Sequence, residues 1–207
     1  MATIKNEIWL VRHGETAWSR TGQHTGITDI PLTSVGRKEA KSLKRTLRAT
    51  SFQTVLVSPL SRAKETCQLA GYGDLAQLDS DLQEWNYGDF EGKTGEEIRQ
   101  RIPGWTLWTG SIPCGESLES VVLRAKRVLQ KITDSPGNAL VFSHGDVIRI
   151  LAALWLGIST SVAQALALDT ASVSILGWEE GVRGLVRWNW AHFCQTETAN
   201  QHHPNHE

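Results

Sequence analysis

Three short apolar runs, each followed at once by polar residues, constrain the fold of this chain more than any other feature. The runs span residues 7–11 (EIWLV), 54–58 (TVLVS) and 139–143 (ALVFS). Each has the length and composition of a buried strand. Segments with helical periodicity separate the runs, and strands that alternate with helices are typical of a mostly parallel α/β sheet.

Apolar spacing and capping residues place the helices. We expect helices from residue 34 with Thr33 as the N-cap, from Pro59 to Leu69, near residues 95–102, over residues 117–132, and from residue 144 to Leu156. The helix over 117–132 is the clearest, because its apolar residues form one stripe at positions 118, 121, 122, 125, 128, 129 and 132. Residues 16–32 are rich in Gly, Thr and Ser and predict a loop.

The C-terminal part of the sequence adds three expected strands. Residues 164–168 (QALAL), 172–178 (SVSILGW) and 184–190 (GLVRWNW) have strand character, and the turn EEGVRG makes the last two a hairpin. We therefore expect an α/β sandwich whose mostly parallel sheet has an antiparallel edge.

The length of 207 residues fits one domain, which we place at residues 1–193. Residues 71–115 hold Gly, Pro, Trp and short polar runs, and we interpret them as a cap-like excursion that covers one end of the sheet. The polar tail at 194–207 is predicted to be disordered, and we do not interpret its His202, His203 and His206 as a metal site.

Charge and composition argue against several classes of protein. The formal net charge is −1, so a bulk attraction to nucleic acid or to an anionic membrane is not indicated. The longest apolar stretch, from Val147, is interrupted by Arg149 and is too short to span a bilayer. The N-terminus has no signal-peptide pattern, and three scattered cysteines favour a reducing cytoplasm.

Cationic residues collect at the ends of the first three strands. The first strand is followed by Arg12 and His13, the second by Ser58 and Arg62, and the third by His144. Ligands of open α/β sheets bind at the carboxyl ends of the strands, so these side chains converge if the three strands are neighbours. Such a cluster calls for an anion with several oxygens, and the planar guanidinium groups suit phosphate.

The same residues offer chemistry beyond binding. An imidazole can attack phosphorus and form a phosphohistidine, and His13 is our candidate nucleophile. His144 is then a hydrogen-bond donor to the equatorial oxygens of the transition state. We also expect free backbone N–H groups at the start of the helix after Ser58, and a close approach of the anion at Gly14 and Gly145.

A leaving alkoxide needs a proton, and carboxyl groups are its candidate source. The segment LQEWNYGDFEG supplies Glu84, Asp89 and Glu91, and local charge does not choose among them. A carboxyl close to a phosphate has a raised pKa, so it can act as an acid and then as a base toward water. Asp146 lies beside the expected phosphate pocket and is a rival donor.

Four strings, LVRHGETAW, SPLSRAKET, LQEWNYGDFEG and VFSHGD, resemble in order and spacing the motif series of the histidine phosphatase superfamily, also called phosphoglycerate-mutase-like. The resemblance runs from residue 8 to about residue 190. It implies a three-layer α/β/α sandwich around a six-stranded sheet. It also implies that His13 is the phosphorylated nucleophile, that Glu84 is the proton donor, and that the phosphate pocket is completed by Arg12, Arg62 and His144.

Within the superfamily, the strings WSRTGQHTGITDIPLT, EWNYGDFEG and WTLWTGSIPCGES are most similar to the sedoheptulose bisphosphatase group. This similarity implies a substrate pocket lined by Gln23, His24, Thr25, Tyr87 and Arg149. Mutases of the superfamily carry an Arg-His pair where this chain has Trp85 and Asn86, and Ser19 stands where many members have asparagine. These differences favour hydrolysis over phosphate transfer.

The expected function is hydrolysis of a small phosphorylated metabolite, favouring a sugar phosphate or bisphosphate, with no cofactor, metal, nucleic acid or membrane. The alternatives are mutase-type phosphotransfer, a non-enzymatic phosphate-binding module, and a metal enzyme that uses His13, His24 and His144. Glu116 is either a helix-dipole residue or a partner of the site cations. Arg149 either meets a second anionic group of the substrate or caps a local carboxylate. The sequence leaves the oligomeric state open.

Overall fold

The computed structural model describes residues 6–190, in which six strands form one sheet in the order β3-β2-β4-β1-β5-β6. The strands are β1 (Ile8–Arg12), β2 (Thr54–Val57), β3 (Gln77–Leu78), β4 (Ala139–Ser143), β5 (Val173–Glu179) and β6 (Val182–Trp190). The pairs β3–β2, β2–β4 and β4–β1 are parallel, whereas β1–β5 and β5–β6 are antiparallel. The predicted mixed sheet with an antiparallel edge is confirmed.

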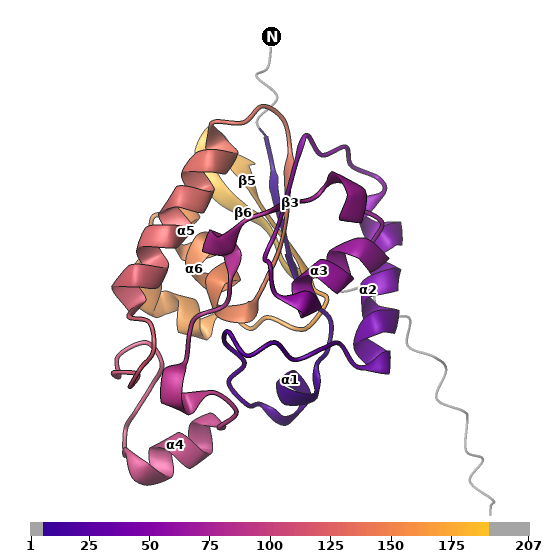
Figure 1. Cartoon of the computed structure of the whole chain (residues 1–207). Coiled ribbons are helices and arrows are strands. Elements are labelled where there is room, and N and C mark those ends of the chain that lie inside the picture. Colours follow the sequence, from indigo (N-terminus) through magenta and orange to yellow (C-terminus); the bar gives the residue numbers. More distant parts are fainter. Residues whose placement is uncertain (1–5, 191–207) are drawn as a thin grey trace, which may run out of the picture.

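Helices cover both faces of this sheet (Figure 1). One face carries α2 (Ser34–Leu47) and α3 (Ser61–Leu69), and the other carries α5 (Leu118–Thr133) and α6 (Gly145–Leu156). Two short helices, α1 (Ala17–Thr21) and α4 (Gly95–Arg101), lie beyond the end of the sheet where β1 finishes. The chain also makes 3-10 turns over Gly73–Leu75, Ser80–Leu82, Gly88–Phe90 and Thr160–Ala165.

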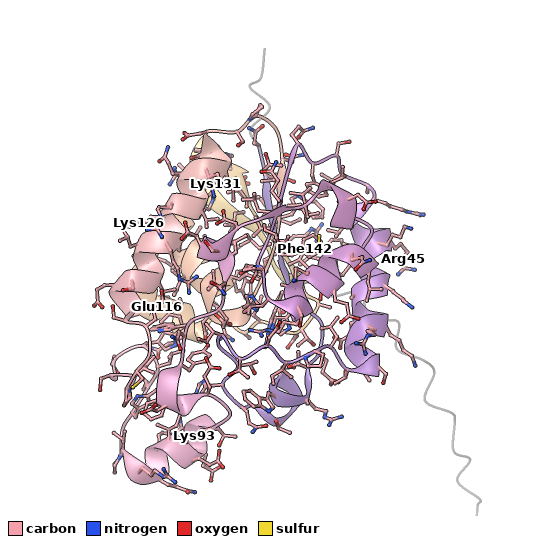
Figure 2. All side chains as sticks on the ribbon, viewed as in Figure 1. Arg45, Lys93, Glu116, Lys126, Lys131 and Phe142 are labelled. Carbon is pink, nitrogen blue, oxygen red and sulfur yellow. The ribbon has the colours of Figure 1, made fainter. Side chains whose placement is uncertain are left out.

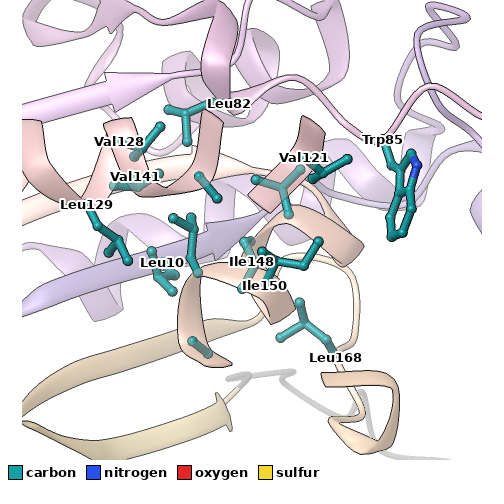
Figure 3. Packing of buried hydrophobic residues seen from close by; sticks show 14 of the residues in the cluster. Leu10, Leu82, Trp85, Val121, Val128, Leu129, Val141, Ile148, Ile150 and Leu168 are labelled. Carbon is teal, nitrogen blue, oxygen red and sulfur yellow. The ribbon is translucent and has the colours of Figure 1, made fainter. Parts of the chain in front are cut away.

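Alternating side chains of β1 feed two separate cores, one on each face of the sheet. Trp9 and Val11 belong to the core beneath α2 and α3, whereas Leu10 belongs to the core beneath α5 and α6. Figure 3 shows the second of these cores, in which Leu10 lies among side chains that include Leu129 of α5 and Ile148 of α6. The β1 run is apolar throughout because both of its faces are buried.

The predicted strand at residues 164–168 is wrong, because side chains use the backbone there. The carbonyl of Leu166 accepts a hydrogen bond from Arg149 Nε at 2.7 Å. The carbonyl of Leu168 accepts one from Arg12 Nη1 at 2.5 Å. Backbone groups that satisfy two arginines in this way are not available to a sheet ladder.

The sixth strand is instead β3, a two-residue strand that lies inside the 71–115 excursion and pairs with β2. The predicted loop at 16–32 also contains α1, which begins with a capping box at Thr16 and ends at Gly22 in the left-handed conformation. Helix α3 starts at Ser61, two residues later than the sequence predicts. The other predicted helices begin and end within one residue of their expected bounds.

Many charged side chains of the helices are exposed, whereas Arg62, Arg124 and Asp146 are buried. Figure 2 shows Lys126 and Arg45 at opposite edges of the molecule and Phe142 near its centre, and Phe142 is fully buried. Within residues 6–190, no helix has the length and apolar character needed to cross a membrane. The tail histidines at 202, 203 and 206 lie outside the described residues.

Two leucines on α5 provide a matched test of the core. Leu129 is 8 % exposed and packs under the sheet, whereas Leu123 on the same helix is 59 % exposed. Leu129→Ala should lower the free energy of unfolding by about 2–5 kcal/mol in urea titrations. Leu123→Ala should change it by about 0.5 kcal/mol or less. Equal losses in the two variants would contradict the orientation of α5.

Candidate active site

The strands β2, β4 and β1 are neighbours, so the polar residues at their carboxyl ends meet as predicted. The rings of His13 and His144 lie 5.2 Å apart between centroids. Arg62, from the first turn of α3, donates from Nε to His144 Nδ1 at 3.2 Å. All three side chains are buried, and His13, the most exposed of them, is only 4 % exposed.

Arg62 is held by backbone carbonyls of the 16–32 loop. Its Nη2 donates to the carbonyls of Gly26 at 2.7 Å and Thr25 at 3.2 Å, and its Nη1 donates to Thr28 at 3.1 Å. The side chain is 0 % exposed, and this burial lowers the pKa of Arg62. The guanidinium therefore fixes the loop and at the same time brings positive charge into the site.

His13 is in the state that a nucleophile needs. Its Nδ1 lies 2.8 Å from the carbonyl of Gly14, which can only accept, so Nδ1 carries the proton and Nε2 has a free lone pair. Burial, followed by the charges of Arg62 and Arg12, holds the pKa of His13 well below its ordinary value. The ring is therefore neutral at physiological pH.

His144 is fixed in the opposite tautomer. Its Nδ1 accepts from Arg62, so the proton is on Nε2, which donates to Ser58 Oγ at 2.7 Å. Burial, with the charge of Arg62 next, holds the pKa of His144 well below its ordinary value. The predicted donation from His144 to a phosphate oxygen requires the imidazole ring to move, so that Nε2–H points to the phosphate rather than to Ser58.

Carboxylates take the backbone N–H groups at the starts of two helices. At α3, the N–H of Ser61 donates to both oxygens of Asp29, at 2.9 and 3.1 Å, so the predicted free N–H groups after Ser58 are wrong at this position. At α6, the N–H groups of Asp146 and Val147 donate to Glu84 at 3.2 and 3.3 Å. The helix dipoles favour negative charge at both places.

Glu84 is the carboxyl that the fold brings to the cationic cluster. It is 5 % exposed, and burial, followed by the charge of Asp146, raises the pKa of Glu84 to about 7. A Cβ added to Gly145 would lie 3.7 Å from Glu84 Oε2 and 3.6 Å from Arg12 Nε, so both side chains lie close to this glycine. Arg12 Nε is buried and has no hydrogen-bond partner among the described residues.

The other candidate acids lie in different settings. Glu91 accepts the N–H groups of Ile27 and Thr28, both at 2.8 Å, and so braces the loop. Asp89 is exposed at the surface. Asp146 is 8 % exposed and belongs to a hydrogen-bonded group with Tyr87 and Arg149.

The predicted substrate residue Arg149 caps a local carboxylate. Its Nη1 donates to Asp146 Oδ1 at 2.7 Å. Tyr87 donates its hydroxyl to Asp146 Oδ2 at 2.5 Å. Burial, followed by Asp146, raises the pKa of Tyr87 well above its ordinary value, so the phenol stays neutral.

The remaining predicted substrate residues lie on the 16–32 loop. Gln23 uses its amide inside the protein, donating to the Gly92 carbonyl at 2.6 Å and accepting from Thr21. The Thr25 hydroxyl donates to the Gln23 carbonyl at 3.1 Å. The ring of His24 lies 4.8 Å from that of Tyr87, and its buried Nε2 has no partner within the described residues.

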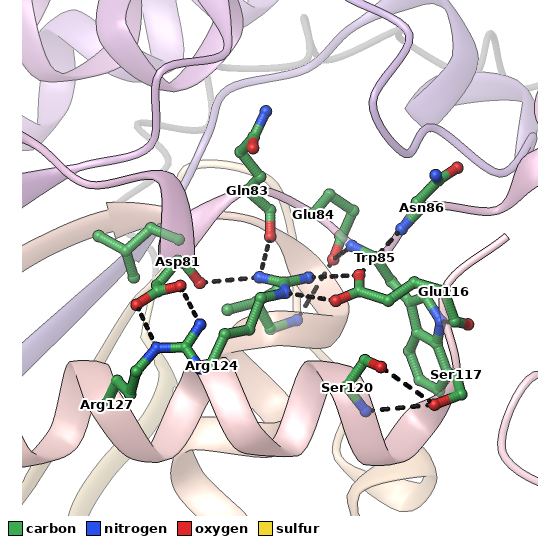
Figure 4. A network of polar contacts seen from close by, with 12 residues as sticks. Asp81, Gln83, Glu84, Trp85, Asn86, Glu116, Ser117, Ser120, Arg124 and Arg127 are labelled. Carbon is green, nitrogen blue, oxygen red and sulfur yellow. Dashed lines mark hydrogen bonds and ion pairs between the residues drawn. The ribbon is translucent and has the colours of Figure 1, made fainter.

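Arg124, on α5, is a positioning residue that the sequence did not single out. Its guanidinium donates to both oxygens of Glu116, at 2.8 and 3.0 Å, and to the backbone carbonyls of Asp81 and Gln83 (Figure 4). Glu116 therefore pairs with a helix arginine rather than with the predicted site cations. The sequence does place an arginine at position 124 beside the apolar stripe of the helix, which could have indicated that this side chain is buried and paired.

A cleft of about 350 Å³ lies beside Arg12. It is lined by Arg12, Glu15, Ser19, Arg20, Asp169 and Thr170. The part of the chain that the structure describes contains no group of three His, Cys, Asp or Glu residues that could hold a metal ion. The metal alternative based on His13, His24 and His144 therefore lacks its ligand set there.

Most of the chain matches a family of known proteins. The family model described as "Histidine phosphatase superfamily (branch 1)" matches residues 8–191. An acid phosphatase of Mycobacterium tuberculosis is 36 % identical over 190 residues, which cover 90 % of this chain and 93 % of that protein. A sedoheptulose 1,7-bisphosphatase of Saccharomyces cerevisiae is 33 % identical, covering 76 % of this chain and 70 % of that protein.

A solved structure shares the fold as well. The product of an open reading frame of Mycobacterium tuberculosis superposes with a TM-score of 0.85 and 35 % sequence identity. The match covers 90 % of this chain and 98 % of the other. The predicted six-stranded α/β/α sandwich is thus found in a relative of known structure.

Glu84 should make the free energy of unfolding depend on pH. Its pKa rises from 4.5 to about 7 on folding, so the folded state binds the proton more tightly and loses stability as the pH rises through that window. At about 1.4 kcal/mol per pKa unit the loss is about 3 kcal/mol. Urea titrations of Glu84→Gln between pH 4.5 and 8 should lack this decline, and Glu96→Gln, an exposed control on α4, should keep it. A Glu84→Gln profile parallel to that of the wild type would contradict the raised pKa.

Proposed function

The chain belongs to the histidine phosphatase superfamily, and we propose that it hydrolyses a small sugar phosphate or bisphosphate through a phosphohistidine at His13. One observation carries the proposal. A neutral His13 with a free Nε2 lone pair and a carboxyl, Glu84, with a pKa near 7 lie in one buried cationic cluster. A module that only binds phosphate needs neither a nucleophile nor an acid.

In the first step, His13 Nε2 attacks phosphorus and the bond from phosphorus to the leaving oxygen breaks. Glu84 gives its proton to that oxygen as the alcohol departs. The Nε–H of Arg12, which has no partner among the described residues, is available to a phosphate oxygen, and Arg62 adds its charge.

In the second step, Glu84 is a carboxylate and acts as a base. It takes a proton from a water molecule whose oxygen attacks phosphorus, and the bond from phosphorus to His13 Nε2 breaks. Inorganic phosphate leaves, and Glu84 is again protonated. A pKa near 7 suits both roles, because neither protonation state is costly at neutral pH.

The substrate class rests on two kinds of support. Relatives include an acid phosphatase and a sedoheptulose 1,7-bisphosphatase. The site also has a third arginine, Arg149, whose side chain is 24 % exposed and is available to a distal phosphate. Neutral groups of Tyr87, His24 and Thr25 suit sugar hydroxyls. We also propose a reducing, cytoplasmic setting, since Cys67 and Cys114 are free thiols.

His13→Ala should abolish turnover and leave the fold intact. Rapid acid-free quenching of the wild type with ³²P-labelled substrate should trap label that is stable to alkali and lost in acid, as a phosphohistidine is. The variant should trap none, and its circular dichroism and melting curve should match those of the wild type. Substantial turnover by a folded His13→Ala enzyme would overturn the nucleophile assignment.

Arg149→Ala should raise KM for sugar bisphosphates and change KM for monophosphates little. A lost charge-assisted hydrogen bond is worth roughly 1.5–3 kcal/mol, or about tenfold to more than a hundredfold. Arg20→Ala, which removes an exposed arginine of the cleft, is the matched control and should leave the bisphosphate preference in place.

The assay compares sedoheptulose and fructose bisphosphates with sugar monophosphates and phosphoglycerate. Equal kcat/KM for mono- and bisphosphates in the wild type would exclude the bisphosphate proposal. Isomerisation of phosphoglycerate in preference to phosphate release would instead support the mutase alternative.

A further inference from the structure

Asp146 connects three groups of the site, although the proposed mechanism gives it no step. It lies in the first turn of α6 and is 8 % exposed. Its backbone N–H donates to Glu84 Oε2 at 3.2 Å. Its carboxylate accepts from Tyr87 at 2.5 Å and from Arg149 at 2.7 Å. The two acidic residues are thus joined through a single peptide N–H.

We propose that Asp146 is a positioning residue that holds a proton on Glu84, and that Arg149 sets how strongly it does so. The proposal rests on the proposed role of Glu84 as the general acid. A buried negative charge disfavours a second negative charge beside it, so an ionised Asp146 favours the protonated form of Glu84. A cation bound to Asp146 weakens this effect.

The need for Asp146 follows from the other groups that face Glu84. The cations Arg12 and Arg62 and the N–H groups at the start of α6 all favour a Glu84 carboxylate, which cannot act as an acid. Burial and Asp146 work in the opposite direction, and they are the two largest causes of the raised pKa of Glu84. Asp146 is the only acidic side chain among those causes.

The remaining neighbours carry no charge that could replace Asp146. Tyr87 stays neutral because burial and Asp146 raise its pKa. His13 and His144 are neutral because burial and the arginines lower their pKa values. The balance at Glu84 therefore depends on Asp146 and on the guanidinium bound to it.

Arg149 makes this balance responsive to substrate. It donates to Asp146 from Nη1 and to the Leu166 carbonyl from Nε, and its side chain is 24 % exposed. An anionic group of the substrate that draws the guanidinium toward itself leaves the Asp146 charge less neutralised. Glu84 then holds its proton more tightly, so recognition of a distal phosphate also prepares the acid.

The test is the alkaline limb of kcat/KM against pH, which reports loss of the Glu84 proton in the free enzyme. With a sugar monophosphate, Asp146→Asn should move this limb down by about one pH unit, and Arg149→Met should move it up by a similar amount. Arg149→Lys, which keeps the charge, should leave it near the wild-type position. Tyr87→Phe removes a hydrogen bond to Asp146 without changing charge and should move it least.

General damage to the site would not move the alkaline limb in opposite directions in Asp146→Asn and Arg149→Met. The position of a limb also does not change when a constant fraction of the enzyme is inactive at every pH. Movement of the limb in the same direction in Asp146→Asn and Arg149→Met, or no movement in either, would overturn the inference.

Glu84→Gln separates this inference from the proposed function. The alkaline limb should vanish in that variant, and the loss of rate, about 10²- to 10⁴-fold with sugar phosphates, should be smaller with p-nitrophenyl phosphate, whose leaving group needs little protonation. A limb that persists in Glu84→Gln would refute the acid role itself. If the limb vanishes in Glu84→Gln but keeps its wild-type position in the Asp146 and Arg149 variants, only the coupling of these two residues to the Glu84 proton would be refuted.

The response to substrate is measured on kcat, whose pH profile belongs to the enzyme–substrate complex. In the wild type, the alkaline limb with a sugar bisphosphate should lie above the limb with the monophosphate. The difference should disappear in Asp146→Asn. Equal limbs in the wild type, or a difference that survives in Asp146→Asn, would exclude a role for Arg149 and Asp146 in the response.

Discussion

The burial of the Arg62 guanidinium is the interaction on which the site depends. Three loop carbonyls and a histidine nitrogen accept its hydrogen bonds, so one side chain from α3 joins the 16–32 loop to the end of β4. The same bond fixes the tautomer of His144, and the charge of Arg62 helps to keep His13 neutral. The shape of the loop, the protonation of both histidines and the positive field therefore have a common origin.

Two carboxylates, Asp29 and Glu84, lie near the positive charge of the site. Asp29 binds the N–H of Ser61 at the start of α3, and Glu84 binds N–H groups at the start of α6. Each lies at the positive end of a helix dipole, where a negative charge is favoured. Asp29 lies 4.0 Å from Arg62 and is half-exposed, whereas Glu84 is buried. Burial raises the pKa of Glu84 to about 7, which suits this carboxyl to exchange a proton near neutral pH.

Local sequence patterns predict the fold and the cationic residues at the centre of the site. They do not predict the long-range hydrogen bonds around that centre. Continuous apolar runs predict buried strands, and the order of those strands alone brings Arg12, Arg62 and His144 together. The prediction of a strand at 164–168 is wrong because two carbonyls of this segment accept hydrogen bonds from Arg12 and Arg149, which are distant in sequence. The pairing of Asp146 with Tyr87 is equally long-range, and no spacing rule encodes it.

Arg124 is one of the residues that hold the segment before Glu84 in place. Residues 80–90 contain two short 3-10 turns, and contacts from other elements hold them in place. Arg124 of α5 binds the carbonyls of Asp81 and Gln83, and Ser143 of β4 donates to the carbonyl of Leu82. The position of the segment that leads into Glu84 therefore depends on one side chain of α5, which lies 41 to 43 residues away in the sequence.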